Sequence, residues 1–136
     1  MKYRGQRSTA RYLAGELTLP HSKARSIVCF VPSDGRSRRR RGYDQAEIIA
    51  KHYAKINGID FASLLLRKTH IRQVGLSRVG RFKNVAGNFT VRGRPDSRHI
   101  ILVDDVITTG ATISECAKEL IRAGASSVWA VAAAKR

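Results

Sequence analysis

The sequence predicts an α/β fold in which helices flank a mostly parallel sheet. Two short apolar runs rich in β-branched residues, Ser26 to Val31 and His99 to Val103, are typical of strands that are buried on both faces. The second run is followed by a helical pattern over Ala111 to Ala123 and by a third apolar run over Ser127 to Ala133. A strand, a helix and a strand at this spacing predict a right-handed βαβ unit with parallel strands.

Three further segments complete the expected elements. Gln6 to Leu19 has apolar residues at helical spacing before Pro20, and Tyr43 to Ile56 has a second helical pattern. A third apolar segment begins at Leu64, and from Arg67 to Asn88 the chain is polar and basic without sustained periodicity. Loops of that length in compact domains tend to be functional or mobile. We therefore predict a long loop there.

Composition limits the class of protein. The 136 residues, 43% of them hydrophobic, suit one folded domain over residues 1–136. No apolar run is long enough to span a bilayer, and no secretory signal is recognisable. Cys29 and Cys116 each lie in an apolar pattern, which favours reduced core thiols and a cytoplasmic protein.

The charge of the chain predicts an anionic partner. The sequence has 26 Lys and Arg against 10 Asp and Glu, for a formal net charge of +16. Such a field attracts polyanions, and both phosphates and nucleic acid fit it. Charge alone does not choose between them.

The segment after the second predicted strand carries the strongest indication of a site. Asp104 and Asp105 follow the strand directly, where ligands bind in parallel sheets. The next residues lead into a helix N-terminus, which favours anions, and they are Thr108, Thr109, Gly110, Ala111 and Thr112. Two carboxylates beside an anion cradle suit a sugar phosphate. The alternative is a helix cap with solvated charges, which we consider weaker for so many matched residues.

This segment has a family resemblance. Residues 101–112, from Ile101 to Thr112, resemble the 5-phosphoribosyl 1-diphosphate (PRPP) binding motif of type I phosphoribosyltransferases. Nearly the whole chain is similar to the ComF family of competence-associated, phosphoribosyltransferase-like proteins. The residues that carry this similarity are Lys2 to Gly5, Val31-Pro32, Arg41 to Ala46, Arg67 with Gln73, Arg81 with Asn84, and Gly87 to Phe89. The resemblance implies a Rossmann-like type I fold, with residues 26–136 as core and residues 1–25 as a minimal hood.

The resemblance also implies residue roles. Asp104 and Asp105 would be the catalytic residues, holding the ribose hydroxyls and, mainly through the substrate, Mg²⁺. The segment Thr108 to Thr112 would bind the 5′-phosphate. The pyrophosphate would contact Ser33, Asp34, Gly35, Arg36 and Arg41. A flexible loop over the reacting centre would include Arg67, Gln73, Arg81 and Asn84.

The implied activity is Mg²⁺-dependent transfer of a phosphoribosyl group from PRPP to a nitrogenous acceptor, or the reverse reaction from a nucleoside monophosphate. The alternative is a non-catalytic PRPP-binding or DNA-uptake accessory protein. Three departures from the family pattern bear on the choice. The usual zinc ribbon and a readable nucleobase site are missing, and Asp44 stands where the family motif Arg-Gly-Phe-Asn has its amide. A homodimer is compatible with the sequence.

The basic stretch from Arg36 to Arg41 has five arginines in six positions. It is either a solvated basic loop, a pyrophosphate clamp that uses Arg36 and Arg41, or part of a nucleic-acid surface. No helix-turn-helix, zinc finger or RNA-recognition motif accompanies it. We therefore favour polyphosphate recognition and place non-specific nucleic-acid binding second.

Overall fold

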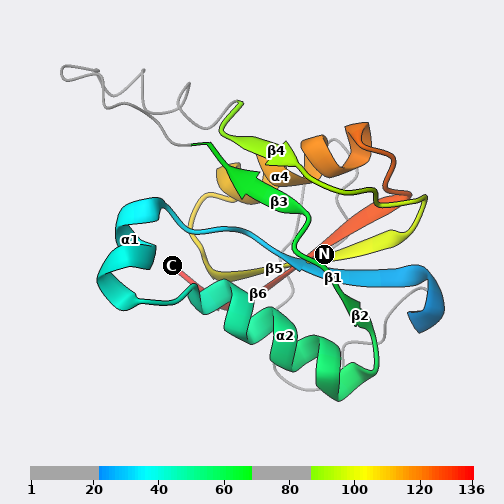
Figure 1. Cartoon of the computed structure of the whole chain (residues 1–136), viewed down its shortest axis with the longest axis horizontal. Helices are drawn as coiled ribbons and strands as arrows, with labels where there is room; N and C mark the ends of the chain where they lie inside the picture. The colour runs from blue at the N-terminus through cyan, green and yellow to red at the C-terminus, as the bar shows by residue number, and fades with distance from the viewer. Residues whose placement is uncertain (1–21, 69–86) are drawn as a thin grey trace.

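A four-stranded parallel sheet forms the centre of the protein (Figure 1). The computed structural model describes residues 22–68 and 87–136. The sheet order is β2-β1-β5-β6, and every neighbouring pair is parallel. Its strands are β1 (Ser26–Phe30), β2 (Asp60–Phe61), β5 (His99–Ile107) and β6 (Ser127–Lys135). The predicted parallel sheet and its βαβ unit are confirmed.

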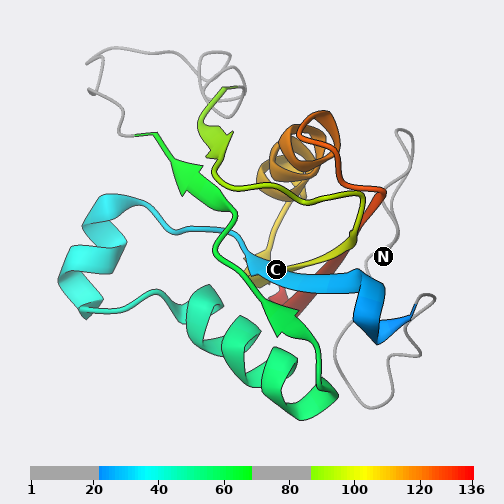
Figure 2. The same cartoon turned by 45° about the vertical axis from the view of Figure 1, so that its right-hand side comes forward.

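Among the described residues, one helix packs on each face of this sheet. Alternate residues of a strand face opposite sides, so β1 and β5 each contribute to two apolar clusters. Helix α2 (Gln45–Asn57) packs on the face with Val28 and Ile101. Helix α4 (Ala111–Arg122) packs on the face with Cys29 and Leu102. Figure 2 shows the two helices on either side of the strands. Burial on both faces explains the continuous apolar runs.

Both cysteines are core residues, as predicted. Cys29 and Cys116 are fully buried and unpaired in the cluster beneath α4. Burial raises the pKa of the Cys29 thiol to about 11, although hydrogen bonds to nearby backbone groups partly oppose the shift. Burial also raises the pKa of Cys116. Such thiols are unreactive at neutral pH.

A two-stranded antiparallel hairpin lies on the α4 side of the sheet. It pairs β3 (Leu65–Arg67) with β4 (Phe89–Val91). Leu65 and Phe89 belong to the apolar cluster beneath α4. Where the chain leaves β3 and enters β4, the Lys68 N–H donates to the Asn88 carbonyl at 2.7 Å. Most of the predicted long loop, residues 69–86, lies outside the described residues, as does the predicted helix Gln6 to Leu19.

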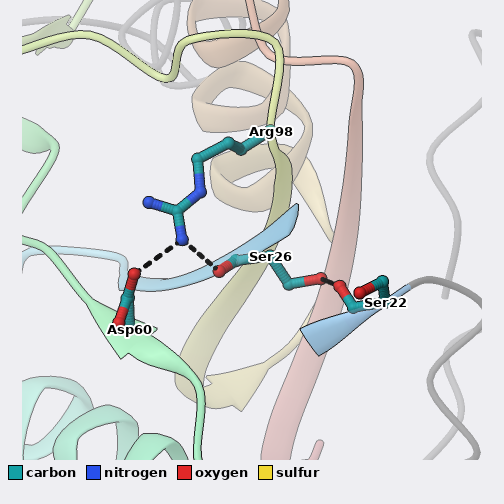
Figure 3. A network of polar contacts seen from close by, with 4 residues as sticks. All are labelled: Ser22, Ser26, Asp60 and Arg98. Carbon is teal, nitrogen blue, oxygen red and sulfur yellow. Dashed lines mark hydrogen bonds and ion pairs between the residues drawn. The ribbon is translucent and has the colours of Figure 1, made fainter. Parts of the chain in front are cut away.

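Arg98 closes the amino-terminal edge of the sheet (Figure 3). Its Nη2 donates to the Ser26 carbonyl at 2.9 Å and to the Asp60 carboxylate at 2.7 Å. The Ser26 hydroxyl donates to the Ser22 carbonyl at 3.0 Å, next to the short 3-10 turn η1 (Lys23–Arg25). This network joins β1, β2 and the start of β5. The opposite, carboxyl edge is the one that carries the candidate site.

Strand β5 is longer than predicted. The apolar run ends at Val103, but the ladder continues, with Asp104 beside Ala132 and Ile107 beside Lys135 of β6. Asp104 and Asp105 therefore lie inside the strand and do not simply follow it. The backbone keeps its pairing with β6 although the side chains have become polar.

The basic stretch is a short helix, so of the three readings left open for it, the solvated basic loop was wrong. Helix α1 spans Gly35–Arg41. The Asp34 carboxylate caps it, accepting from the Ser37 N–H at 2.8 Å, and Gly42 ends it in the left-handed conformation, with φ of 77°. No residue of α1 is buried, so its sequence has no apolar periodicity that would predict a helix.

In the described part of the chain, no helix is long and apolar enough to cross a membrane.

Candidate functional site

The two aspartates stand at the carboxyl end of the central strand β5. Asp104 follows Ile100 and Leu102 on the α4 side, and Asp105 lies on the other side of the strand. Both are half-buried. Each carboxylate accepts a hydrogen bond from the next backbone N–H, from Asp105 to Asp104 at 2.8 Å and from Val106 to Asp105 at 2.9 Å. These bonds hold both carboxylates close to the strand end.

Burial makes this pair electrostatically costly. Burial first, and then the hydrogen bond and negative charge of Asp105, raise the pKa of Asp104 to about 7. The pair therefore holds one proton up to about neutral pH. A cation or a set of hydroxyl donors placed against it would stabilise the fully ionised form. The site thus favours a hydroxyl-rich or cationic ligand at this point.

The turn after β5 presents open backbone at a helix N-terminus. Gly110 is the N-cap of α4 and has φ of 80°, which favours glycine. A Cβ placed on Gly110 would meet no protein atom within 4 Å, so the space above the turn is open. Thr109 Oγ1 accepts from the Ala111 N–H at 3.3 Å, and Thr108 and Thr109 are exposed. Free N–H groups and the helix dipole make this turn a place for an anion.

The turn after β1 lies next to the aspartates along the same edge. The Val31 N–H donates to the Val103 carbonyl at 2.9 Å, which places Pro32 and Ser33 beside the end of β5. Ser33 donates from its N–H and its hydroxyl to Asp44, at 2.8 and 2.9 Å. The Ser37 hydrogen bonds lower the pKa of Asp34, and the Arg67 charge contributes. The polar groups of Ser33 and Asp34 are thus already engaged within the protein.

Arginines of α1 line an open hollow of about 590 Å³. Arg36, Arg39 and Arg40 share one helix face and border it with Asp34 and Ser37. Of the two arginines predicted to clamp pyrophosphate, Arg36 lines this hollow. The described lining does not include the other, Arg41, whose Nε donates to the Ser37 carbonyl at 3.4 Å.

Sequence reasoning missed Arg39 and Arg40 as partners of Arg36. The signal that could have found them is the capping pattern of Asp34 and Ser37, since a helix starting there puts positions three and four apart on one face.

Arg67 is part of the ordered hairpin and not of a loop. Its Cζ lies 5.3 Å from the centre of the Phe89 ring, and its Nη1 makes a long contact, 3.5 Å, with the Pro32 carbonyl. The Arg67 side chain thus connects the hairpin to the turn after β1. The other predicted loop residues, Gln73, Arg81 and Asn84, lie outside the described residues.

The residues present suit a divalent metal only if the ligand supplies most of its oxygens. The part of the chain that the structure describes has no group of three or more His, Cys, Asp or Glu residues able to hold a metal ion. Asp104 and Asp105 offer two carboxylates, and Mg²⁺ prefers few protein ligands with phosphate oxygens and water. The donor set therefore fits a metal that arrives with a phosphorylated substrate.

Solved structures share this architecture. One is described as the allosteric regulatory enzyme of purine biosynthesis, with a TM-score of 0.55, 20% identity, and coverage of 79% of this chain and 22% of that one. Another is the glutamine PRPP amidotransferase from B. subtilis, complexed with ADP and GMP, with a TM-score of 0.54, 22% identity and the same coverage. The fold is therefore that of the type I phosphoribosyltransferases.

Curated relatives narrow the class. The DNA utilization protein YhgH of Escherichia coli K12 is 32% identical over 103 residues, 74% of this chain and 45% of the relative. Competence protein F of Haemophilus influenzae is 34% identical over 102 residues, 70% of this chain and 44% of the relative. The chain thus spans less than half the length of these relatives, and no family model matches it. Over these residues the chain is similar to Competence protein F, and its fold is that of the phosphoribosyltransferases.

Proposed function

We propose that this domain binds PRPP and transfers its phosphoribosyl group to or from a nitrogenous acceptor with the help of Mg²⁺. One observation carries the proposal. Two half-buried carboxylates, Asp104 and Asp105, lie in the last residues of the central strand β5, which leads into an open turn at the N-terminus of α4. A PRPP amidotransferase shares the fold, which supports the same assignment.

The two halves of the site would bind different groups of the ligand. The N–H groups and hydroxyls of the turn from Thr108 to Thr112 would hold the 5′-phosphate, and the carboxylates of Asp104 and Asp105 would accept from the ribose hydroxyls. Bound Mg²⁺ would be held by these carboxylates and by substrate oxygens, and it would neutralise charge on the pyrophosphate.

The residues of the site would then stabilise the reacting centre. The C1′–O bond to pyrophosphate breaks with its electron pair, a C1′–N bond forms, and the acceptor nitrogen loses a proton. Positive charge develops on the sugar ring in such a reaction, as in glycoside chemistry, and ionised carboxylates nearby stabilise it. We propose that Asp105 is the group that accepts this proton.

Calorimetric titration with PRPP, with and without Mg²⁺, tests the proposal. We expect binding that requires Mg²⁺ and that disappears in the double variant Asp104→Asn, Asp105→Asn. Asp60→Asn, at the opposite edge of the sheet, is the matched control and should bind as the wild type does. A folded wild-type protein that binds no PRPP would overturn the proposal. Binding without turnover over a panel of nucleobases would restrict it to PRPP recognition.

A specific observation favours a second, non-catalytic function in nucleic-acid binding. Arg36, Arg39 and Arg40 project from one exposed helix face around an open hollow, and two named relatives are a DNA utilization protein and a competence protein. Guanidinium groups suit phosphate oxygens. The double aspartate variant separates the two functions, because it should keep or increase DNA affinity while it loses PRPP.

A further inference from the structure

Asp44 occupies a capping position that it does not use. It is the N-cap residue of α2, yet its side chain makes no capping hydrogen bond. Aspartate at this position normally accepts from the first helical N–H groups, which stabilises the helix. The Asp44 side chain is instead directed to Ser33, eleven residues earlier, and the residue is 4% exposed. A buried carboxylate that gives up its helix cap requires another explanation.

That carboxylate takes both donors of Ser33. One oxygen, Oδ2, accepts from the Ser33 N–H at 2.8 Å and from the Ser33 hydroxyl at 2.9 Å. On the other side of the turn, Arg67 Nη1 approaches the Pro32 carbonyl at 3.5 Å. The turn after β1 is therefore held from the start of α2 and from the hairpin. Its shape depends on Asp44, and Ser33 has no donor left for a ligand.

We infer that Asp44 is a positioning residue that fixes the turn after β1 for the pyrophosphate end of the site, and that Ser33 contacts Asp44 and not the ligand. This inference rests on the proposed function. It replaces the sequence-based role of Ser33 as a pyrophosphate ligand. It also explains how an acidic residue is compatible with a neighbouring polyanion, because its oxygen is turned into the protein by two hydrogen bonds.

The geometry and the charge of Asp44 can be separated by substitution. Asp44→Asn keeps an oxygen that can accept both Ser33 bonds and removes a negative charge. Asp44→Ala removes the acceptor and leaves the Ser33 donors unpaired. Ser33→Ala removes one of the two bonds and keeps the backbone N–H bond. Asp60→Ala, which deletes a carboxylate at the opposite edge, controls for a general loss of stability.

Calorimetry with Mg²⁺ and PRPP, and NMR titration with ribose 5-phosphate, form the test. We expect Asp44→Ala to weaken PRPP binding about tenfold, since two partly buried Ser33 donors lose their acceptor. Asp44→Asn and Ser33→Ala should stay within about threefold of the wild type, because an acceptor or a bond remains. Ribose 5-phosphate, which lacks the pyrophosphate, should bind Asp44→Ala as it binds the wild type.

Three results would overturn the inference. These are wild-type PRPP affinity in Asp44→Ala, an equal loss of both ligands in that variant, and a loss in Ser33→Ala as large as in Asp44→Ala. If the wild-type protein binds no PRPP, the proposed function fails. Amide hydrogen exchange then still tests the positioning role. The Ser33 N–H should exchange faster in Asp44→Ala than in the wild type and Asp60→Ala, and equal rates would exclude that role.

Discussion

Arg67 and Phe89 face each other across the β3–β4 hairpin, with the guanidinium carbon 5.3 Å from the centre of the ring. Phe89 is 1% exposed, so the ring is fixed in the core and the arginine lies over it. The same guanidinium reaches the Pro32 carbonyl at 3.5 Å. The pair therefore couples the hairpin that flanks residues 69–86 to the turn after β1. A cation over a desolvated ring is a favourable contact.

Phe89→Leu and Arg67→Met measure that coupling in a double-mutant cycle. Phe89→Leu should lower the free energy of unfolding by about 1 to 2 kcal/mol, because it removes core volume and the ring face. Arg67→Met keeps an apolar stem and removes the cation. Urea unfolding of the single and double variants should give a coupling of about 0.5 to 1 kcal/mol. Strictly additive effects would show that the stacked geometry contributes no stability.

The pKa of Asp104 predicts how stability depends on pH. Burial and the neighbouring Asp105 raise the folded-state pKa from 3.8 to about 7, so between these values the folded protein keeps a proton that the unfolded chain has lost. The free energy of unfolding should therefore fall as pH rises from about 4 to about 7, by at most about 1.4 kcal/mol for each pH unit. Asp104→Asn should flatten this part of the profile and be more stable than the wild type at pH 8. Denaturant titrations over this pH range measure both proteins. Parallel profiles of unfolding free energy against pH for the wild type and Asp104→Asn would contradict the prediction.

Much of the fold could be predicted because the relevant signals are local. The apolar runs of β1 and β5 arise from burial on both faces of the sheet, and the helical periodicity of α2 and α4 arises from burial of one face of each helix. The carboxyl end of β5 and the existence of α1 could not be predicted from such local signals. Asp104 ends the apolar run although its backbone still pairs with Ala132, and α1 buries no side chain at all.

The arrangement of the candidate site residues was predictable where they are contiguous in sequence. Asp104, Asp105 and the turn to Gly110 lie on one strand–helix junction, so their proximity follows from the chain itself. Ser33 and Asp44 are eleven residues apart, and their pairing depends on how α2 returns to the sheet. No local pattern encodes such a contact. The same holds for the packing of Arg67 against Phe89.

Salt dependence distinguishes the arginine face of α1 from its other side. Arg36→Ala with Arg40→Ala removes two guanidinium groups from the hollow. If both contact phosphates of single-stranded DNA, the slope of log affinity against log salt should fall by about 1.4, at roughly 0.7 per contact. Arg38→Ala with Arg41→Ala removes the same charge from outside the described lining and is the matched control. Fluorescence anisotropy over a salt series measures both. Equal losses of slope would mean that total charge, and not this face, determines binding.

Gly110 and Gly58 form a matched pair for testing the phosphate turn. Both are at helix ends with positive φ, 80° for Gly110 and 63° for Gly58, and a Cβ on either would meet no protein atom within 4 Å. Alanine at each position should therefore cost a similar amount of stability, about 1 kcal/mol of backbone strain. Only at Gly110 would the new methyl group occupy the open space above the turn, where the proposed 5′-phosphate approaches the backbone.

Gly110→Ala should accordingly weaken ribose 5-phosphate binding about tenfold, as loss of a hydrogen bond to a charged group would. Gly58→Ala should leave the affinity for ribose 5-phosphate unchanged. Its thermal stability should fall by the same amount as that of Gly110→Ala. NMR titration and thermal unfolding of the two variants give both quantities. Wild-type affinity in Gly110→Ala would place the phosphate away from this turn. An equal loss of affinity in Gly58→Ala would show that strain, and not blocked access, is responsible.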